Sequence, residues 1–348
     1  MPKTRSNKKR TRLSIKHSRR QHFKGGRGNC KHTRKPTRGG AAVTQSKFQH
    51  LTCSPLSEEY KHGNPTSTHD KCLPNNEIKV IKDYWNNANP FKRITATNPD
   101  QIWKEIRTHL SGTCKDDLCI LNQPFMKMAK HKSSLHQRSG GAEYDPKDYY
   151  APKMPKEWKK NPTEWLSNIE ILEKMKQYEE AYPCFEFLGP TPIDFDKVLS
   201  DKHCVEKELC SFNLRDYISH GTKKIGIIFN TDPHDKGGSH WISLFINVPK
   251  KMIFFFDSAG DEAPPEVITF VKRVQQQGLA LSPPIQFKFD QNYPNEHQYS
   301  TTECGMYSLY FIINMLEDKL TTKYLKTHII PDQQMIDYRK KYFNSTDA

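Results

Sequence analysis

Apolar residues recur along the chain at helical spacing in some segments and as short continuous runs in others. The triplet Asn98-Pro99-Asp100 has the composition of a helix start and Gly112 that of a stop. Between them, four apolar residues share one helical face: Ile102, Trp103, Ile106 and Leu110. A second amphipathic helix is predicted within 163–182, where Ser167 and Glu170 have the spacing of a capping box.

The chain beyond this helix is richer in strands. The β-rich runs and helical segments follow in the order strands 224–230, 240–247 and 252–257, helix 267–277, strand 285–290 and helix 304–319. The second and third strands are joined by Val248-Pro249-Lys250-Lys251, which predicts a hairpin. Helices and strands in this order predict an α+β domain over 156–343 with a mixed β-sheet flanked by helices.

Two further segments precede this domain. Residues 70–155 have a globular composition and are expected to form a small helical module. Residues 1–57 are rich in Lys, Arg, Gly, Ser and Thr and contain few large apolar side chains. Such a segment cannot bury enough surface to offset its ordering entropy, so we expect a disordered basic tail. A hydrophobic share of only 35% agrees with an unpacked segment.

Charge is distributed very unevenly. The formal net charge is +15, from 54 Lys and Arg against 39 Asp and Glu. Fifteen of the basic residues lie between Met1 and Gly40, which contains no acidic residue, so the rest of the chain is neutral. This excludes an overall basic fold that coats nucleic acid. The tail at 1–40 is expected to act as a nucleic-acid arm or a nuclear-import signal, with a merely solubilising tail as the alternative.

No apolar run reaches the roughly 18–20 residues that cross a bilayer, and the N-terminus lacks a secretory signal, so no membrane partner is expected. Nine cysteines without regular spacing suggest reduced thiols inside a cell rather than a disulfide framework. Cys114 and Cys119, with His109 nearby, have a loose zinc-ligand spacing. Because no second pair follows, a reduced structural pair is favoured and no metal or cofactor is expected.

Four residues stand at predicted element ends in an order that suits a cysteine nucleophile: His240, Asp257, Gln298 and Cys304. A free thiol, with a pKa of about 8.5, is mostly protonated at neutral pH. The start of a helix and a nearby imidazolium both favour the thiolate, so Cys304 is the expected nucleophile and His240 its general base and acid. Asp257 is expected to orient the imidazole.

The amide of Gln298 and the backbone N–H of Cys304 are expected to stabilise an oxyanion, and Gly305 to leave room for a substrate backbone. Gln291 is an alternative oxyanion donor and Asn247 an alternative orienting residue. A histidine beside a tryptophan, or one buried cysteine, is usually structural when met alone. The order of all four residues favours catalysis.

The sequence resembles the ubiquitin-like-protein proteases (SUMO deconjugases) and the adenovirus protease. The motifs that match are His240-Trp241, Asp257-Ser258, Gln298 and Glu303-Cys304-Gly305-Met306-Tyr307, with Glu303 in place of the more usual Asp. The resemblance implies a papain-like cysteine protease architecture with a circularly permuted order, His-Asp-Gln-Cys. The run 164–168 resembles the segment that opens the family's domain beside the active site, so Trp165, with Trp241 and Gly305, is expected to contact substrate.

The upstream module, with 102–105, the two cysteines and 155–158, resembles the N-terminal extension of thiol proteases from giant (nucleocytoplasmic large) DNA viruses. This resemblance implies cleavage of viral structural polyproteins after Gly-Gly during virion maturation. The expected location is the virion and the host cytoplasm (the viral factory), with the nucleus open through the tail. Alternatives are an isopeptidase that removes ubiquitin-like modifiers, an acyltransferase and a non-enzymatic nucleic-acid-binding scaffold.

The tail itself contains Gly39-Gly40-Ala41. If the enzyme cleaves after Gly-Gly, removal of residues 1–40 by its own activity would release the whole excess of positive charge. Gly25-Gly26 shows that such pairs also occur in the tail without that context. We state self-processing as a hypothesis.

Overall fold

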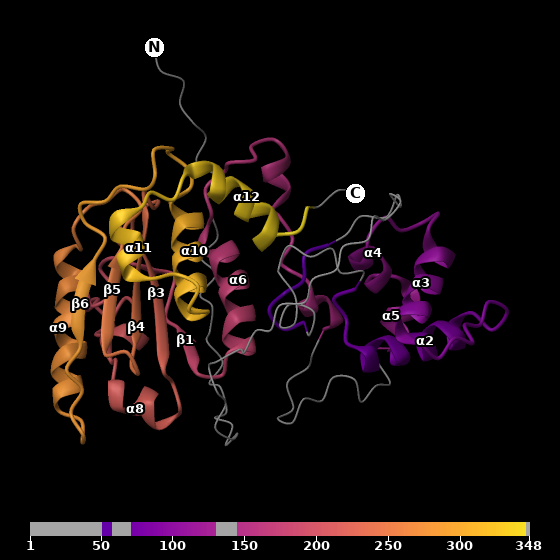
Figure 1. Cartoon of the computed structure of the whole chain (residues 1–348), viewed down its shortest axis with the longest axis horizontal. Helices are drawn as coiled ribbons and strands as arrows, with labels where there is room; N and C mark the ends of the chain where they lie inside the picture. Colours follow the sequence, from indigo (N-terminus) through magenta and orange to yellow (C-terminus); the bar gives the residue numbers. More distant parts are fainter. Residues whose placement is uncertain (1–50, 58–70, 130–144, 346–348) are drawn as a thin grey trace, which may run out of the picture.

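A computed structural model describes residues 51–57, 71–129 and 145–345 (Figure 1). Its centre is a mixed six-stranded sheet with the order β1-β3-β4-β5-β6, in which β2 also pairs with β3. The strands are β1 (Phe185–Phe187), β2 (Thr191–Pro192), β3 (Lys224–Asn230), β4 (Trp241–Asn247), β5 (Met252–Phe256) and β6 (Lys288–Gln291). The antiparallel set β3-β4-β5 includes the predicted hairpin. The α+β class with a mixed sheet is confirmed.

Helices cover both faces of the sheet, which explains why all seven residues of β4 are buried. On one face lie α6 (Asn168–Ala181), α10 (Cys304–Leu316) and α12 (Asp332–Tyr342), against the Phe245 side of β4. On the other face lie α8 (Leu214–Ser219) and α9 (Pro265–Leu279), against the Leu244 side. Two short helices, α7 (Lys207–Cys210) and α11 (Thr322–Thr327), complete this part of the fold.

Local sequence signals locate most of these elements. The capping box at Ser167 and Glu170 is present at the start of α6. The predicted strand 224–230 coincides with β3. The predicted strand 285–290 is observed later, at β6, because the backbone N–H of Ile285 donates to the carbonyl of Gly278 at the end of α9.

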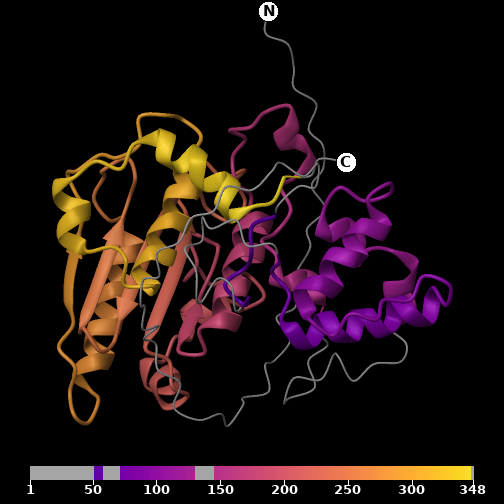
Figure 2. The ribbon, with the colours of Figure 1, turned by 45° about the vertical axis from the view of Figure 1, so that its right-hand side comes forward.

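The residues before the sheet form an apolar cluster of their own. Figure 2 shows their helices grouped apart from the sheet. The helices of this cluster are α2 (Asn75–Ala88), α3 (Pro99–Leu110), α4 (Asp117–Leu121) and α5 (Pro124–Ala129). Asn98 caps α3 as predicted, accepting from the backbone N–H groups of the next turn. Two 3-10 turns, η2 (Pro146–Tyr149) and η3 (Lys156–Lys159), lead from these helices into α6.

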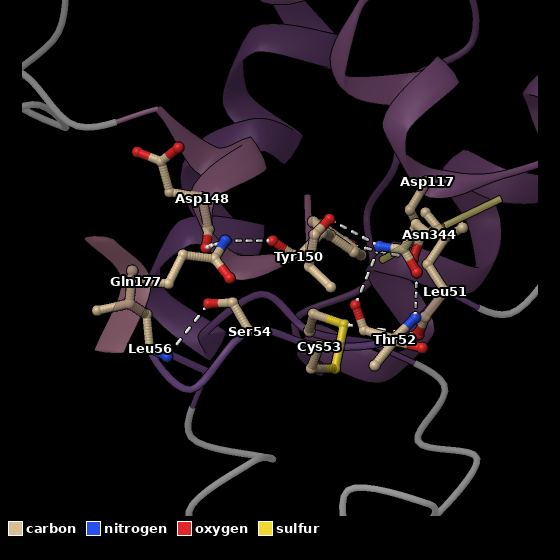
Figure 3. The surroundings of a disulfide bond; sticks show 12 residues. Leu51, Thr52, Cys53, Ser54, Leu56, Asp117, Asp148, Tyr150, Gln177 and Asn344 are labelled. Atoms are coloured by element: carbon tan, nitrogen blue, oxygen red, sulfur yellow. Dashed lines mark hydrogen bonds between the residues drawn. A yellow bond between two sulfur atoms is a disulfide. The ribbon is translucent and has the colours of Figure 1, made fainter. Parts of the chain in front are cut away.

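Residues 51–57, which the composition assigned to the disordered tail, are packed instead. The side chain of Asn344, near the C-terminal end, accepts from the N–H of Thr52 and donates to the carbonyls of Thr52 and Ala151 (Figure 3). Its own backbone N–H donates to the carbonyl of Pro152. Three distant segments therefore meet at Asn344, and the tail assignment is wrong for 51–57. Residues 1–50 lie outside the described part of the chain.

The expectation of reduced thiols is also wrong for seven cysteines of the described residues, one of which is Cys184. Disulfides join Cys53 to Cys72, Cys114 to Cys119, and Cys204 to Cys210. Asp116 caps α4 through the N–H of Cys119, and this tight turn brings the Cα atoms of Cys114 and Cys119 to 5.4 Å. The pair is thus neither a zinc site nor reduced. The spacing of the two cysteines along the chain did not predict this, because it does not reveal the turn that brings them within disulfide distance.

Candidate active site

The predicted nucleophile is the first residue of a buried helix. Cys304 begins α10 and is only 2% exposed, and it is the free cysteine of the described residues. All thirteen residues of α10 are buried, so the helix start is held from every side. The unpaired N–H groups and the positive end of the helix dipole at this point favour a thiolate.

Strand register brings His240 and Asp257 together. His240 immediately precedes β4 and Asp257 immediately follows β5, and the antiparallel register pairs Ser243 with Phe256. Nε2 of His240 lies 2.6 Å from Oδ1 of Asp257, which is 4% exposed. The bond sets the tautomer with the proton on Nε2, so Nδ1 is left for the thiol.

His240 also contacts Cys304 through a side-chain hydrogen bond. Burial by itself lowers the pKa of His240. The hydrogen bonds to Asp257 and Cys304, with the negative charges of both groups, outweigh burial and raise the pKa to about 10. The imidazole is therefore held as an imidazolium at neutral pH, the state that stabilises a thiolate and can later donate a proton.

Asn292 fixes Asp257, and sequence reasoning missed it. Its Oδ1 accepts from the N–H of Asp257 at 2.9 Å, and its Nδ2 donates to the carbonyl of Asp257 at 2.7 Å. The Asp257 carboxylate also accepts from the N–H of Ala259 at 2.9 Å. Asn292 directly follows β6, the strand parallel to β5, so the neighbouring strand ends were the signal that could have found it.

Gln298 lies on the loop before α10 and its amide is fixed at both ends. Oγ of Ser258 donates to its Oε1 at 2.7 Å, and its Nε2 donates to the carbonyl of Ser300 at 2.8 Å. Its backbone N–H donates to the carbonyl of Ser258 at 2.9 Å. An amide nitrogen has two hydrogens, so one remains for an oxyanion. The loop that carries Gln298 is thus tied to the residue after Asp257.

The expected substrate residues surround the start of α10. Nε1 of Trp241 donates to the carbonyl of Leu166 at 2.9 Å. A β-carbon at Gly305 would lie 2.9 Å from Cβ of Leu166 and 3.2 Å from Cδ1 of Trp241, so close helix packing already requires glycine there. Trp165, beside Leu166, is 41% exposed. Contact of Trp165, Trp241 and Gly305 with substrate stays a prediction.

The two alternative residues lie elsewhere. Oε1 of Gln291 accepts from the N–H of Ala263, which engages the amide away from the nucleophile. Asn247 ends β4 at the opposite end from His240 and accepts from the N–H of Lys250 in the hairpin turn. Both alternatives are therefore engaged in contacts of their own, and Asp257 and Gln298 stay the preferred predictions.

Within the described ranges, no group of three or more His, Cys, Asp or Glu side chains is arranged to hold a metal ion. Over the same residues, none of the helices has the length and apolar character needed to cross a bilayer.

Comparison with known proteins finds relatives for the part of the chain that carries the site. Residues 220–348, which contain all four candidate catalytic residues, match the model described as Ulp1 protease family, C-terminal catalytic domain. A thiol protease, R355, of Acanthamoeba polyphaga mimivirus is 34% identical over 155 residues, which make up 44% of this chain and 48% of that protein. The chain thus spans about half the length of this relative.

Relatives from African swine fever virus match over a longer stretch. The protein named SUMO-1 cysteine protease S273R, from a Kenyan pig isolate, is 25% identical over 255 residues, covering 70% of this chain and 89% of the relative. The crystal structure of the pS273R protease of this virus has the same fold, with a TM-score of 0.57 at 21% identity over 85% of this chain and 98% of that one.

The fold and the Cys304–His240–Asp257 arrangement define a cysteine protease domain. Specifically, residues 220–348 match the catalytic domain of the Ulp1 protease family, and the chain is similar to thiol proteases of large DNA viruses.

Proposed function

We propose that this protein is a cysteine endopeptidase that cleaves after Gly-Gly and processes viral structural polyproteins during virion maturation. The observation that carries the peptidase activity is the alignment of three groups. Cys304 starts a buried helix, His240 contacts it, and Asp257 holds the far side of the imidazole at 2.6 Å.

The first half of the reaction forms an acyl-enzyme. The Cys304 thiolate attacks the scissile carbonyl carbon, and the carbonyl oxygen becomes an oxyanion. The free hydrogen on Nε2 of Gln298 and the N–H of Cys304 stabilise that charge. His240, as an imidazolium, gives its Nδ1 proton to the leaving amine while Asp257 holds Nε2. The C–N bond then breaks and a thioester remains.

The second half consumes water. Neutral His240 takes a proton from a water molecule at Nδ1, and the hydroxide equivalent attacks the thioester. The carboxylic acid product leaves, and the proton held by His240 restores the ion pair with the Cys304 thiolate. All bonds and protons are accounted for by the side chains present.

Two features support small residues before the cleaved bond. The start of α10 is crowded, because Leu166 and Trp241 approach Gly305 so closely that a β-carbon would not fit. Trp165 adds a large exposed ring next to this packing. A substrate strand without side chains passes such surroundings more readily than one with them. The resemblance to proteases that act after Gly-Gly points the same way.

A second candidate is an isopeptidase that removes ubiquitin-like modifiers. The name of the African swine fever virus relative, SUMO-1 cysteine protease, favours it. An exposed apolar pair at the start of α6 also suits a folded protein partner, since Trp165 is 41% and Ile169 51% exposed.

The test compares two substrate classes. Purified protein is incubated with peptides containing Gly-Gly-X, Gly-Ala-X or Ala-Gly-X, and separately with an isopeptide-linked SUMO conjugate; Cys304→Ala is the control. We expect Cys304-dependent cleavage of Gly-Gly-X alone among the peptides. Cleavage of the conjugate with no peptide cleavage would replace the endopeptidase by the isopeptidase. No Cys304-dependent cleavage of either class would contradict both.

We further propose that the basic segment 1–40, outside the described residues, binds nucleic acid with little sequence preference and brings the protease to an assembling particle in the viral factory or to the nucleus. Binding of a labelled DNA duplex that is lost in a variant lacking 1–40, and that weakens steeply with salt, is the expected result. Equal binding by both proteins would contradict the proposal.

A further inference from the structure

A buried ion pair lies directly before the nucleophile. Nε of Arg339, on α12, donates to Oε2 of Glu303 at 2.9 Å. Both side chains are almost inaccessible, at 3% and 1% exposure. Glu303 is the N-cap residue of α10, so its carboxylate stands one residue from Cys304. The pair joins helix α12 to the start of the helix that carries the thiol.

The guanidinium of Arg339 lies over an aromatic ring from the segment that precedes α6. Its Cζ lies 4.6 Å from the ring centroid of Trp158, a residue of η3 that is 5% exposed. The Trp158 ring packs edge-on against Phe343, at 5.2 Å between centroids. Among the described residues, Nη1 and Nη2 of Arg339 have no hydrogen-bond partner, so the carboxylate and the ring are its principal contacts.

A lone carboxylate at position 303 would oppose catalysis. A like charge close to a thiolate disfavours its charged form. Asp332 is a second carboxylate on this side of the fold. The Tyr307 hydroxyl donates to it and is also influenced by the charge of Glu303, so two negative groups lie close enough to act on one residue. Arg339 supplies a cation from inside the fold, where neither solvent nor salt screens it strongly.

We propose that Arg339 is a positioning residue that, through Glu303, holds Cys304 and its thiolate, and that Trp158 keeps this pair dry. The proposal deepens the proposed function, since it rests on Cys304 as the nucleophile. Its consequence is that the segment leading out of the N-terminal helices contributes to the reactivity of the thiol.

The test measures the thiol without any substrate. The rate of Cys304 alkylation by iodoacetamide is followed by intact mass between pH 5 and 10, with Cys304→Ser to identify other reacting sites. The variants are Arg339→Met, Glu303→Gln, the double variant and Trp158→Leu. Lys340→Met, at the exposed neighbouring position on α12, is the matched control.

Arg339→Met is expected to slow alkylation at pH 7 about 10-fold, since the unpaired carboxylate of Glu303 then acts as a like charge on the thiolate. The double variant, which removes both charges, is expected to return within about 3-fold of wild type, as is the control. Trp158→Leu is expected to give an intermediate rate. Circular dichroism melts establish which variants are folded at the assay temperature.

Two results would overturn the proposal. One is a folded Arg339→Met that alkylates like wild type. The other, which applies even if Arg339→Met does not fold, is a folded double variant that alkylates about 10-fold more slowly than wild type, because neutralising the pair would then not restore the thiol. If Trp158→Leu is alkylated at the wild-type rate, Trp158 has no part in the reactivity of the thiol and only the Arg339–Glu303 pair remains in the proposal. A reactive Cys304 in a protein that cleaves no peptide would count against the proposed function and leave this inference standing.

Discussion

Ser258 donates a 2.7 Å hydrogen bond to Oε1 of Gln298, and this bond decides which way round the amide lies. With Oε1 held by a donor, Nε2 is the end left to donate, and one of its hydrogens is free for the oxyanion. Ser258 is buried at 1% exposure, so no solvent molecule readily replaces its hydroxyl. The residue after the orienting aspartate therefore sets the oxyanion donor.

Ser258→Ala should lower kcat on a Gly-Gly-X peptide about 10-fold with KM little changed, because a misoriented donor loses part of the 10²–10³-fold that one oxyanion donor contributes. Ser258→Thr, which keeps the hydroxyl, should retain most activity. Steady-state kinetics give the two constants. Iodoacetamide alkylation of Cys304 should be unchanged; an equal loss there would mean that the substitution merely damages the fold.

The bonds to Asp257 and Cys304 outweigh burial and raise the pKa of His240 to about 10. The pH profile of kcat/KM should therefore stay high far into the alkaline range before it falls. Because the folded pKa is raised, the imidazolium persists until the pH passes about 10. Asp257→Asn removes a hydrogen-bonded charge and should move this alkaline fall of kcat/KM down by about 1–3 pH units. If the alkaline fall of kcat/KM stays at the same pH in Asp257→Asn, a group other than His240 causes it.

The same shift links His240 to stability. A histidine whose pKa is raised on folding contributes stability that is fully present below its unfolded value of about 6.5 and is lost as the pH rises toward 10. Chemical denaturation at pH 6, 8 and 10 should therefore show a decline that His240→Gln lacks. Parallel curves for the two proteins would contradict this linkage.

Lys174 is buried on α6, 1% exposed, with its Nζ over the rings of Tyr178 and Tyr342 at 5.4 and 5.2 Å. Burial lowers its pKa to about 7, although Glu317 acts in the opposite direction. Below pH 7 the fold must hold a buried charge, and this cost disappears as the pH rises from 7 toward 10.5. Lys174→Met should raise Tm by a few degrees at pH 6, since about 1 kcal/mol corresponds to 2–4 °C in large chains.

The advantage of Lys174→Met should shrink by pH 9, where differential scanning calorimetry gives the second Tm. Lys176→Met, on the same helix and outside the buried set, is the matched control. A gain that is the same at both pH values would mean that burial of the charge is not its cause.

Asn344 predicts how the N-terminal segment is held. Asn344→Ala deletes three side-chain hydrogen bonds in a buried position and should lower the free energy of unfolding by about 2–3 kcal/mol. Amide hydrogen exchange at 51–57 should rise first. Asn344→Asp keeps the acceptor for the N–H of Thr52 but places a carboxylate oxygen against the carbonyls of Thr52 and Ala151, so it should lose at least as much. Unchanged exchange at 51–57 in the alanine variant would show that the Cys53 disulfide and the backbone bonds to 149–151 hold the segment without Asn344.

The hypothesis of self-processing concerns Gly40-Ala41, which lies outside the described residues. Intact mass of purified enzyme and of Cys304→Ala after long incubation measures it directly. We expect only the active protein to lose Met1–Gly40. If both retain the tail while the active enzyme cleaves a Gly-Gly-X peptide, self-processing is wrong.

Local signals made part of this molecule predictable. The cap at Ser167 and the hairpin between β4 and β5 depend on neighbouring residues, and the hairpin alone brings His240 to Asp257. Contacts over long distances were not predictable in this way. Glu303 and Arg339 are 36 residues apart and Ser258 and Gln298 are 40 apart, and nothing in either local sequence indicates its partner.

The cysteines show the same limit. An odd number of irregularly spaced cysteines led to an expectation of reduced thiols, whereas Cys53 and Cys72 are joined across the described chain with Cα atoms 5.2 Å apart. Likewise, residues 51–57 contain no Lys or Arg, unlike the tail before them, and their packing depends on Asn344, 292 residues away from Thr52. The composition of a segment indicates how well it can be solvated on average. It does not show whether one distant side chain, such as Asn344, forms hydrogen bonds with the segment.

The burial of every residue of α10 ties the reactive sulfur to the most protected backbone of the fold. Local opening, which frees loops and chain ends at little cost, leaves this helix closed until the sheet itself separates. Peptidase activity should thus stay at its full value while loops and chain ends open. It should then be lost over the same narrow range of temperature as the near-UV circular dichroism signal. Residual activity in a sample then counts native molecules, so a simple turnover assay measures the folded fraction.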